Sequence, residues 1–139
     1  MKYLLLAFIL LLLPKLSFGA ELPVTLNCDC EVWNNFDVKY AEWCENYMRE
    51  KGYKTSQAEF DRRKTVGLIE RQDYVSGLMN GFEYLYINSP KTETSEYYRF
   101  PYRLREYVTE IDFYCKDPQH KNEKITDVIL KVNYSLKHK

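Results

Sequence analysis

The sequence predicts an all-α protein: a small, disulfide-stapled bundle of about four helices that follows a cleaved signal peptide. Two observations predict the helices. Apolar residues recur at three- and four-residue steps in four segments, and the connections between these segments are short and polar. A third observation predicts the disulfides, because all four cysteines follow an N-terminal stretch with the features of an export signal.

The export signal is predicted over residues 1–19. Tyr3–Leu13 is an unbroken apolar run after a charged start, and Ser17 and Gly19 are small residues of the kind found at cleavage sites. A membrane-spanning helix needs ~20 apolar residues, about twice this run, which disfavours the alternative of an uncleaved anchor. Cleavage would leave residues 20–139 as a single helical domain, without a membrane-spanning stretch. We expect it in the periplasm, with secretion from the cell as the alternative.

The charge balance disfavours a nucleic-acid partner. The chain carries 20 basic and 20 acidic residues. Two of the basic residues, Lys2 and Lys15, lie in the predicted signal peptide, so the mature chain is slightly acidic. Nucleic-acid-binding proteins normally carry a basic surface, so the sequence predicts no such partner.

The first two predicted helices are rich in aromatic residues. The first covers Trp33 to Met48 and is followed by Gly52, a residue typical of helix ends. The polar stretch Lys54–Lys64 is interpreted as a connection with room for one helical turn. The second helix is predicted from about Lys64 to Asn88. Its expected inward residues are Leu68, Tyr74 or Val75, Leu78, Met79, Phe82, Leu85 and Tyr86.

Gly77 and Gly81 lie four residues apart within this second helix. Glycine in a helix interior costs ~1 kcal/mol relative to alanine, so a pair of glycines indicates that another backbone approaches closely. We predict a helix-packing role for both. A membrane role for this spacing is disfavoured because Arg71, Asp73 and Glu83 flank it.

Two shorter helices are predicted in the last third of the chain. Asn88-Ser89-Pro90 is expected to end the second helix, and Lys91–Glu96 is predicted to be a loop. The third helix is predicted over Arg103–Tyr114, with Leu104, Tyr107, Val108, Ile111 and Tyr114 on its inward side. Cys115–Pro118 is expected to form a turn. The last helix is predicted to begin near Asn122 as its N-cap. Its expected inward residues are Ile125, Val128, Ile129, Val132 and Leu136.

The four cysteines predict two disulfides formed by Cys28, Cys30, Cys44 and Cys115. A Cys28–Cys30 bridge would close a strained ring, which leaves two connectivities open. Cys28 pairs with Cys115 and Cys30 with Cys44, or Cys28 pairs with Cys44 and Cys30 with Cys115. The lone Cys-x-Cys spacing is not typical of a zinc site. We therefore predict neither a metal nor a cofactor.

The sequence predicts a protein that is not an enzyme and has no catalytic residue. It has no Gly-x-Ser-x-Gly, His-Glu-x-x-His or phosphate-binding glycine motif. Cys115 and His120 are close in sequence, but a cysteine in a disulfide has no thiolate with which to attack. Glu106, Glu110 and Asp112 have the helical spacing typical of a solvated face.

The segment from Tyr97 to Arg103 is the most suggestive surface candidate. It interleaves tyrosine with arginine, two residue types that are enriched in the hot spots of protein interfaces. The alternative is that these rings cover a small core with few aliphatic residues. A homodimer also stays open as an assembly. The residues predicted to contact a protein partner are Tyr97, Tyr98, Arg99, Tyr102 and Arg103.

Three motifs carry a resemblance to a known family. They are Tyr74-Val-Ser-Gly77-Leu-Met-Asn-Gly81-Phe82, Phe113-Tyr-Cys115-Lys-Asp-Pro118 and Ile125-Thr-Asp-Val128-Ile129-Leu-Lys-Val132. Together they resemble the Rap/Tai family of type VI secretion amidase immunity proteins, over about Tyr74 to Leu136. That family is similar in being small, exported and helical. Its members commonly carry a cysteine shortly before the Tyr-x-x-Gly motif, which this sequence lacks, and the Cys28-x-Cys30 pair is outside the family's pattern.

The resemblance implies a periplasmic immunity protein that binds and blocks a peptidoglycan-cleaving amidase toxin. A different possibility is an acid-stress chaperone resembling the HdeA group, which is also small, helical, periplasmic and disulfide-bonded. Such a chaperone would become disordered and bind client proteins in acid. A small hydrolase, a secreted effector and an exported protein-binding module of unknown partner also stay open.

Overall fold

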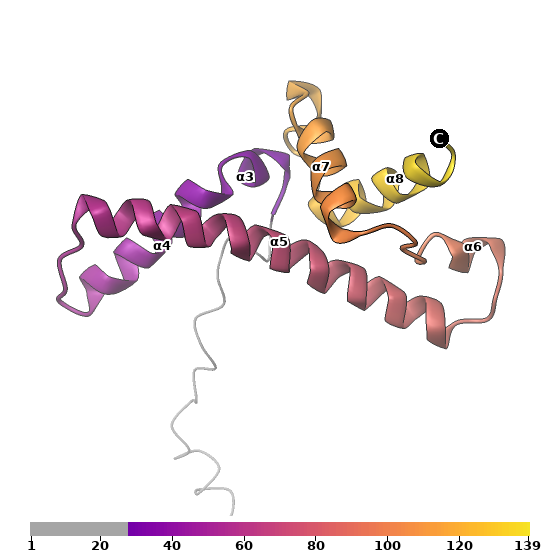
Figure 1. The fold of residues 1–139 in the computed structure, drawn as a ribbon, viewed down its shortest axis with the longest axis horizontal. Helices are drawn as coiled ribbons and strands as arrows, with labels where there is room; N and C mark the ends of the chain where they lie inside the picture. The colour runs from indigo at the N-terminus through magenta and orange to yellow at the C-terminus, as the bar shows by residue number, and fades with distance from the viewer. Residues whose placement is uncertain (1–27) are drawn as a thin grey trace, which may run out of the picture.

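The computed structural model describes residues 28–139, and this part of the chain is helical, which confirms the all-α fold class (Figure 1). The predicted signal peptide lies outside the described residues. A 3₁₀ turn, η1, covers Pro118–His120. The α-helices are α3 (Cys30–Asn34), α4 (Phe36–Glu50), α5 (Gln57–Asn88), α6 (Glu93–Glu96), α7 (Leu104–Cys115) and α8 (Ile125–Lys137).

The first predicted helix is divided into α3 and α4 at Asn35. Asp29 begins α3 as its N-cap, since its side chain accepts a hydrogen bond from the backbone N of Val32 at 3.0 Å. Asn35 ends α3 and begins α4, and its side-chain amide donates to the carbonyl of Glu31 at 3.0 Å. Asparagine favours helix ends because its short side chain competes for backbone hydrogen bonds.

α5 begins at Gln57, seven residues before the predicted start. Ser56 caps it, and its hydroxyl accepts from the backbone N of Glu59 at 3.3 Å. Glu59 in turn forms ion pairs with Arg62 at 2.8 Å and Arg63 at 2.9 Å. The N-cap and these ion pairs stabilise the first two turns of α5, which have no apolar stripe. A prediction based on apolar spacing therefore placed the start of α5 too late.

α4 and α5 form a helical hairpin in which α4 lies along the N-terminal half of α5 (Figure 1). The two backbones approach closely at Gly67, where an added Cβ would lie 2.9 Å from the Cα of Asp37. The predicted packing role of Gly77 and Gly81 within the chain is wrong. Both are exposed, and a Cβ added at either would meet no atom of the described chain within 4 Å. The hairpin ends before it reaches them.

The segment predicted as a loop at Lys91–Glu96 contains the short helix α6. Thr92 caps it in a capping box with Ser95: the Thr92 hydroxyl accepts from the Ser95 backbone N at 3.2 Å, and the Ser95 hydroxyl accepts from the Thr92 backbone N at 3.0 Å. α8 begins at Ile125 with Lys124 as its N-cap, two residues after the predicted Asn122. The start is shifted because Ile125 N donates to the carbonyl of Cys28 at 3.0 Å, next to the isolated β-bridge between Asp29 and Lys124.

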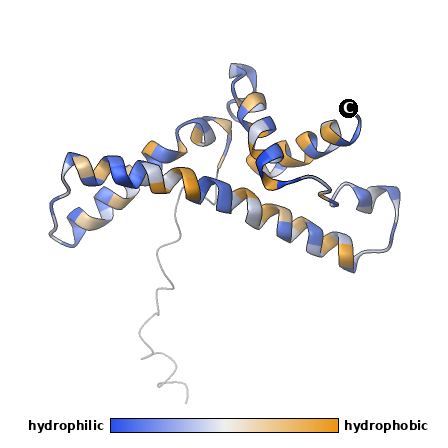
Figure 2. Cartoon of the chain, in the orientation of Figure 1, coloured by the Kyte–Doolittle hydropathy of each residue, from blue (hydrophilic) through white to orange (hydrophobic). Residues whose placement is uncertain are grey.

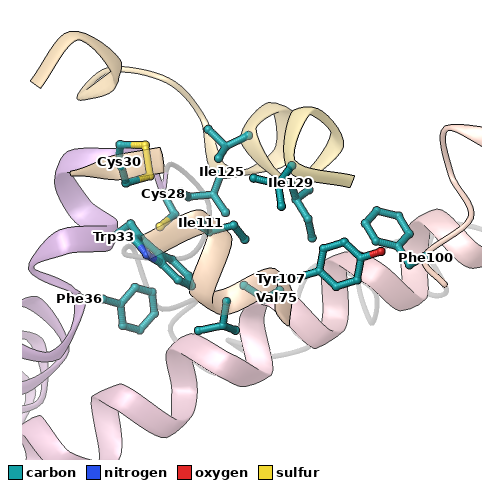
Figure 3. Close-up of a cluster of buried hydrophobic side chains, with 14 residues drawn as sticks. Cys28, Cys30, Trp33, Phe36, Val75, Phe100, Tyr107, Ile111, Ile125 and Ile129 are labelled. Carbon is teal, nitrogen blue, oxygen red and sulfur yellow. A yellow bond between two sulfur atoms is a disulfide. The ribbon is translucent and has the colours of Figure 1, made fainter. Parts of the chain in front are cut away.

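One hydrophobic core joins α3, the start of α4, the middle of α5, α7 and α8 (Figure 3). The inward residues predicted for α8 are confirmed, since Ile125, Val128, Ile129 and Val132 are buried and Leu136 packs against the core. On α5 the prediction is only partly right. Val75 is fully buried, whereas Leu68 and Leu85 are exposed. Its other core-facing residues are Tyr74, Leu78, Met79 and Phe82.

One disulfide is present among the described residues, between Cys30 and Cys115, and it ties α3 to the end of α7. The prediction of two disulfides is wrong, because Cys28 and Cys44 are free buried thiols. Cys44 lies eight residues beyond Phe36, about 12 Å farther along α4, while Cys28 stays beside the start of α8. Burial raises the pKa of the Cys28 thiol to about 12, so this thiol is protonated and unreactive at neutral pH.

Among residues 28–139, no helix has both the length and the apolar character needed to cross a bilayer.

Candidate partner-binding surface

The predicted contact segment, Tyr97 to Arg103, connects α6 to α7 and is fixed in place by α8. Asn133 of α8 is fully buried and forms the attachment. Its side-chain amide donates to the carbonyls of Tyr97 at 2.8 Å and Arg99 at 3.0 Å, and its carbonyl accepts from the Tyr107 hydroxyl at 2.8 Å. A buried amide with all these partners satisfied holds the segment in one conformation.

Tyr97 forms an exposed aromatic stack together with α8. Its ring stacks on Tyr134, with the centroids 5.9 Å apart, and Tyr134 stacks in turn on His138 at 4.1 Å. Tyr97 and Tyr134 are each about half exposed, at 48% and 49%. Beside the stack lies a shallow hollow of about 350 Å³, lined by these three rings and by Glu93, Glu96, Asn133 and Lys137. This is an amphipathic surface of the kind that protein partners use.

Tyr98 is turned inward. Its ring stacks on Phe82 of α5, with the centroids 5.7 Å apart, and Phe100 stacks on the same ring at 5.8 Å. The backbone N of Phe100 also donates to Glu83 of α5 at 3.4 Å. These contacts attach the segment to α5. Tyr98 therefore holds the segment in place and is less available to a protein partner.

The remaining predicted contact residues lie at the surface. Tyr102 donates its hydroxyl proton to the carbonyl of Leu136 at 2.9 Å, and the residue is 38% exposed. Arg99 is exposed and lies 3.8 Å from Glu96. Arg103 precedes α7 and lines a second, open hollow with Tyr102 and Leu136. The structure therefore places Tyr97 at one hollow and Tyr102 and Arg103 at another, and both hollows border the C-terminal part of α8.

Sequence reasoning missed Asn133, Tyr134 and His138 on α8. A signal for Asn133 existed, because it lies four residues after Ile129 and so falls on the inward side of the helix. A polar residue at such a position needs hydrogen-bond partners. Tyr134 and His138 are also four residues apart, but nothing in the sequence indicates that Tyr97 lies beside them. That juxtaposition depends on the tertiary structure.

A second polar cluster links α3, α5 and α7 and has a structural role. Asp112 accepts a hydrogen bond from Trp33 Nε1 at 2.7 Å and pairs with Arg71 at 3.2 Å. The Arg71 guanidinium also lies 4.6 Å from the centroid of the Trp33 ring, a cation–π contact. Glu106, Glu110 and Asp112 were predicted to lie on a solvated face, and for Asp112 this prediction is wrong.

Glu123, just before α8, accepts several charge-assisted hydrogen bonds. Lys131 Nζ donates to it at 2.5 Å and the Tyr114 hydroxyl at 2.9 Å, and His120 Nδ1 lies 2.8 Å away. The bond from Lys131 is the largest cause of a lowered pKa, and together with those from His120 and Tyr114 it brings the pKa of Glu123 to about 2. The ionised carboxylate therefore stabilises the fold above its ordinary pKa of 4.5, and this contribution is lost as the pH falls to about 2.

We expect Glu123→Gln to lower the melting temperature at neutral pH and to make it less dependent on pH between about 4.5 and 2, because glutamine cannot ionise. Thermal unfolding of both proteins across this range measures the effect, and the two melting temperatures should converge near its acidic end. Glu50→Gln, at an exposed carboxylate at the end of α4, is the control. Equal pH profiles for Glu123→Gln and the unaltered protein would contradict this account of Glu123.

Residues 28–139 hold no cluster of three or more His, Cys, Asp or Glu side chains arranged to bind a metal ion. Comparisons with protein-family models, with curated proteins and with solved structures found no match for this chain.

Proposed function

We propose that this protein is an exported inhibitor that binds and blocks a peptidoglycan-cleaving amidase toxin in the periplasm, as an immunity protein does. The proposal rests on the surface formed by the Tyr97–Tyr134–His138 stack and by Tyr102, which the buried Asn133 holds in place. The resemblance of the Tyr74–Leu136 region to the Rap/Tai family supplies the class of partner.

The chemistry of this surface supports binding more than catalysis. Tyrosine gives a large contact area with little side-chain entropy to lose, and a pre-ordered segment reduces the cost of association further. The Cys30–Cys115 disulfide is compatible with an exported protein, because disulfides persist in oxidising compartments. An inhibitor needs such a rigid surface and no catalytic group of its own.

The test uses a purified candidate amidase and the exported, disulfide-bonded protein. We expect stoichiometric inhibition of peptidoglycan cleavage. We expect Tyr97→Ala and Tyr102→Ala each to weaken binding by ~30-fold or more, as truncation of an aromatic hot-spot residue does. Titration calorimetry measures the affinities. Tyr53→Ala is the matched control, because Tyr53 is 62% exposed near the α4–α5 turn, away from this surface.

The outcomes separate two errors. If the unaltered protein neither binds nor inhibits any peptidoglycan amidase, the proposed function is wrong. If it inhibits but the two tyrosine variants bind as tightly as the Tyr53 control, the function stands and the assigned surface is wrong.

Glu123 gives a specific reason to test the acid-stress chaperone as the second candidate. Its contribution to stability declines as the pH falls from 4.5 to about 2, so acid weakens the attachment of α8 to the turn after α7. A chaperone of this kind would lose its tertiary structure in that range and suppress the aggregation of an unfolded client. A protein that stays folded and has no effect on client aggregation at about pH 3 would eliminate this candidate.

A further inference from the structure

The sequence contains one acceptor motif for N-linked glycans, Asn133-Tyr134-Ser135. In an exported protein such a motif normally lies at the surface, because the attached oligosaccharide is bulky and hydrophilic. Here the motif lies within α8, and Asn133 is fully buried. The place that a glycan would occupy is therefore inside the fold.

The burial of Asn133 follows from its position on α8. Hydrophobic and hydrophilic residues alternate along this helix (Figure 2). Asn133 lies four residues after Ile129 and directly after Val132, on the side that faces the core. Ser135, two residues farther on, is exposed. Side chains two residues apart in a helix do not face each other, so the helix separates the amide from the hydroxyl that completes the motif.

Both protons of the Asn133 amide nitrogen are already engaged. The nitrogen donates to the carbonyls of Tyr97 at 2.8 Å and Arg99 at 3.0 Å. Glycan transfer replaces one of these protons. The amide nitrogen forms a bond to C1 of the sugar, the bond from C1 to a lipid-linked diphosphate breaks, and the amide gives up the proton. The new C–N bond is ~1.5 Å long, so the sugar would begin in the space that a backbone carbonyl now occupies.

A glycan on Asn133 would also separate α8 from its neighbours. The Asn133 carbonyl accepts from the Tyr107 hydroxyl at 2.8 Å, and Tyr107 belongs to the hydrophobic core. Tyr134, the middle residue of the motif, stacks on Tyr97. α8 would have to leave these contacts to make room for a sugar, so the glycan and the native packing of α8 exclude each other.

We propose that Asn133 receives an N-linked glycan only while α8 is undocked, and that the attached glycan then prevents α8 from docking. The donor is a lipid-linked oligosaccharide diphosphate. The native protein therefore has to mature in an export compartment that does not attach such glycans, which suits the proposed periplasmic location. The inference does not depend on an amidase as the partner, so the two proposals can fail separately.

Transfer by a purified oligosaccharyltransferase tests the acceptor. The full, disulfide-bonded protein is compared with reduced and alkylated protein, in which Cys30 and Cys115 cannot rejoin. We expect the reduced chain to be modified at least ~10-fold faster, because the native chain must first open at α8. Ser135→Ala lacks the motif and should stay unmodified, and Ser135→Thr keeps the motif. Mass spectrometry measures the extent of modification. Equal modification of the native and reduced forms, or of neither, overturns the proposal.

Production in a cell whose secretory pathway attaches N-linked glycans tests the effect on the fold. We expect the unaltered protein and Ser135→Thr to yield a glycosylated fraction without a cooperative melting transition. Ser135→Ala keeps the three hydrogen bonds of Asn133 and should yield a single unmodified, native form. Glycosylated protein that melts at the same temperature as the unmodified protein would show that the glycan and the fold are compatible, and would overturn the proposal.

Discussion

Replacing Cys30 and Cys115 together with serine is expected to lower the free energy of unfolding by about 4–5 kcal/mol. The two residues are 85 apart in the sequence, so the disulfide closes a long loop and removes many conformations from the unfolded chain. The bond also ties α3 to the end of α7, next to the core. Urea unfolding of the double variant and of the unaltered protein measures the difference. Because small domains have a total stability of ~5–15 kcal/mol, this loss removes about a third or more of the free energy of unfolding.

The matched control is the double replacement Cys28→Ala with Cys44→Ala. Both residues are buried free thiols, so this variant removes two sulfur atoms without removing a bond, and we expect a smaller loss of stability. Thiol titration of the unfolded, unreduced protein should find two reactive thiols. If it finds none, all four cysteines are bonded and our assignment of free thiols is wrong.

Replacing Asn133 with leucine is expected to lower the free energy of unfolding by ~2–4 kcal/mol, although leucine is of similar size and more apolar. The change leaves the carbonyls of Tyr97 and Arg99 and the Tyr107 hydroxyl without their partner. Buried groups that lose a hydrogen-bond partner cost more than the bond itself contributed. Thermal unfolding measures the loss. Hydrogen exchange should show faster exchange of the Tyr97–Arg103 amides than in the unaltered protein.

Tyr107→Phe separates the two roles of Asn133. It removes the hydroxyl bond to Asn133 but keeps both bonds to the Tyr97–Arg99 backbone. We expect a loss of stability of ~1 kcal/mol and unchanged exchange in the segment. Equal protection of the Tyr97–Arg103 amides from exchange in Asn133→Leu and Tyr107→Phe would show that Asn133 does not order the proposed contact surface.

Much of the fold could be predicted because apolar side chains at helical spacing must be buried together. α7 and α8 illustrate this. Their predicted inward residues Tyr107, Val108, Ile111, Ile125 and Ile129 are all buried. The pattern was less informative for α5, where apolar residues occur all around the helix. Leu68 and Leu85 follow the expected spacing but are exposed, because α4 lies along the N-terminal half of this long helix and the core contacts other sides of its middle.

The candidate surface could be predicted only in part. The Tyr97–Arg103 segment stood out by composition, and four of its five predicted residues lie at the surface. Tyr98 has the same residue type as its neighbours but stacks on Phe82, and composition could not distinguish it. Tyr134 and His138 joined the surface through the packing of α8, which lies far from this segment in the sequence.

The sequence by itself determined the all-α class, the order of the helices and the inward sides of the last two, because these depend on local spacing and caps. Only the tertiary structure decided which cysteines are bonded, which glycine receives a neighbouring helix and which tyrosines face outward. These outcomes depend on distances between residues far apart in the chain. Cys30 meets Cys115 and Gly67 meets Asp37, whereas a Cβ added at Gly77 or Gly81 would meet no atom of the described chain within 4 Å.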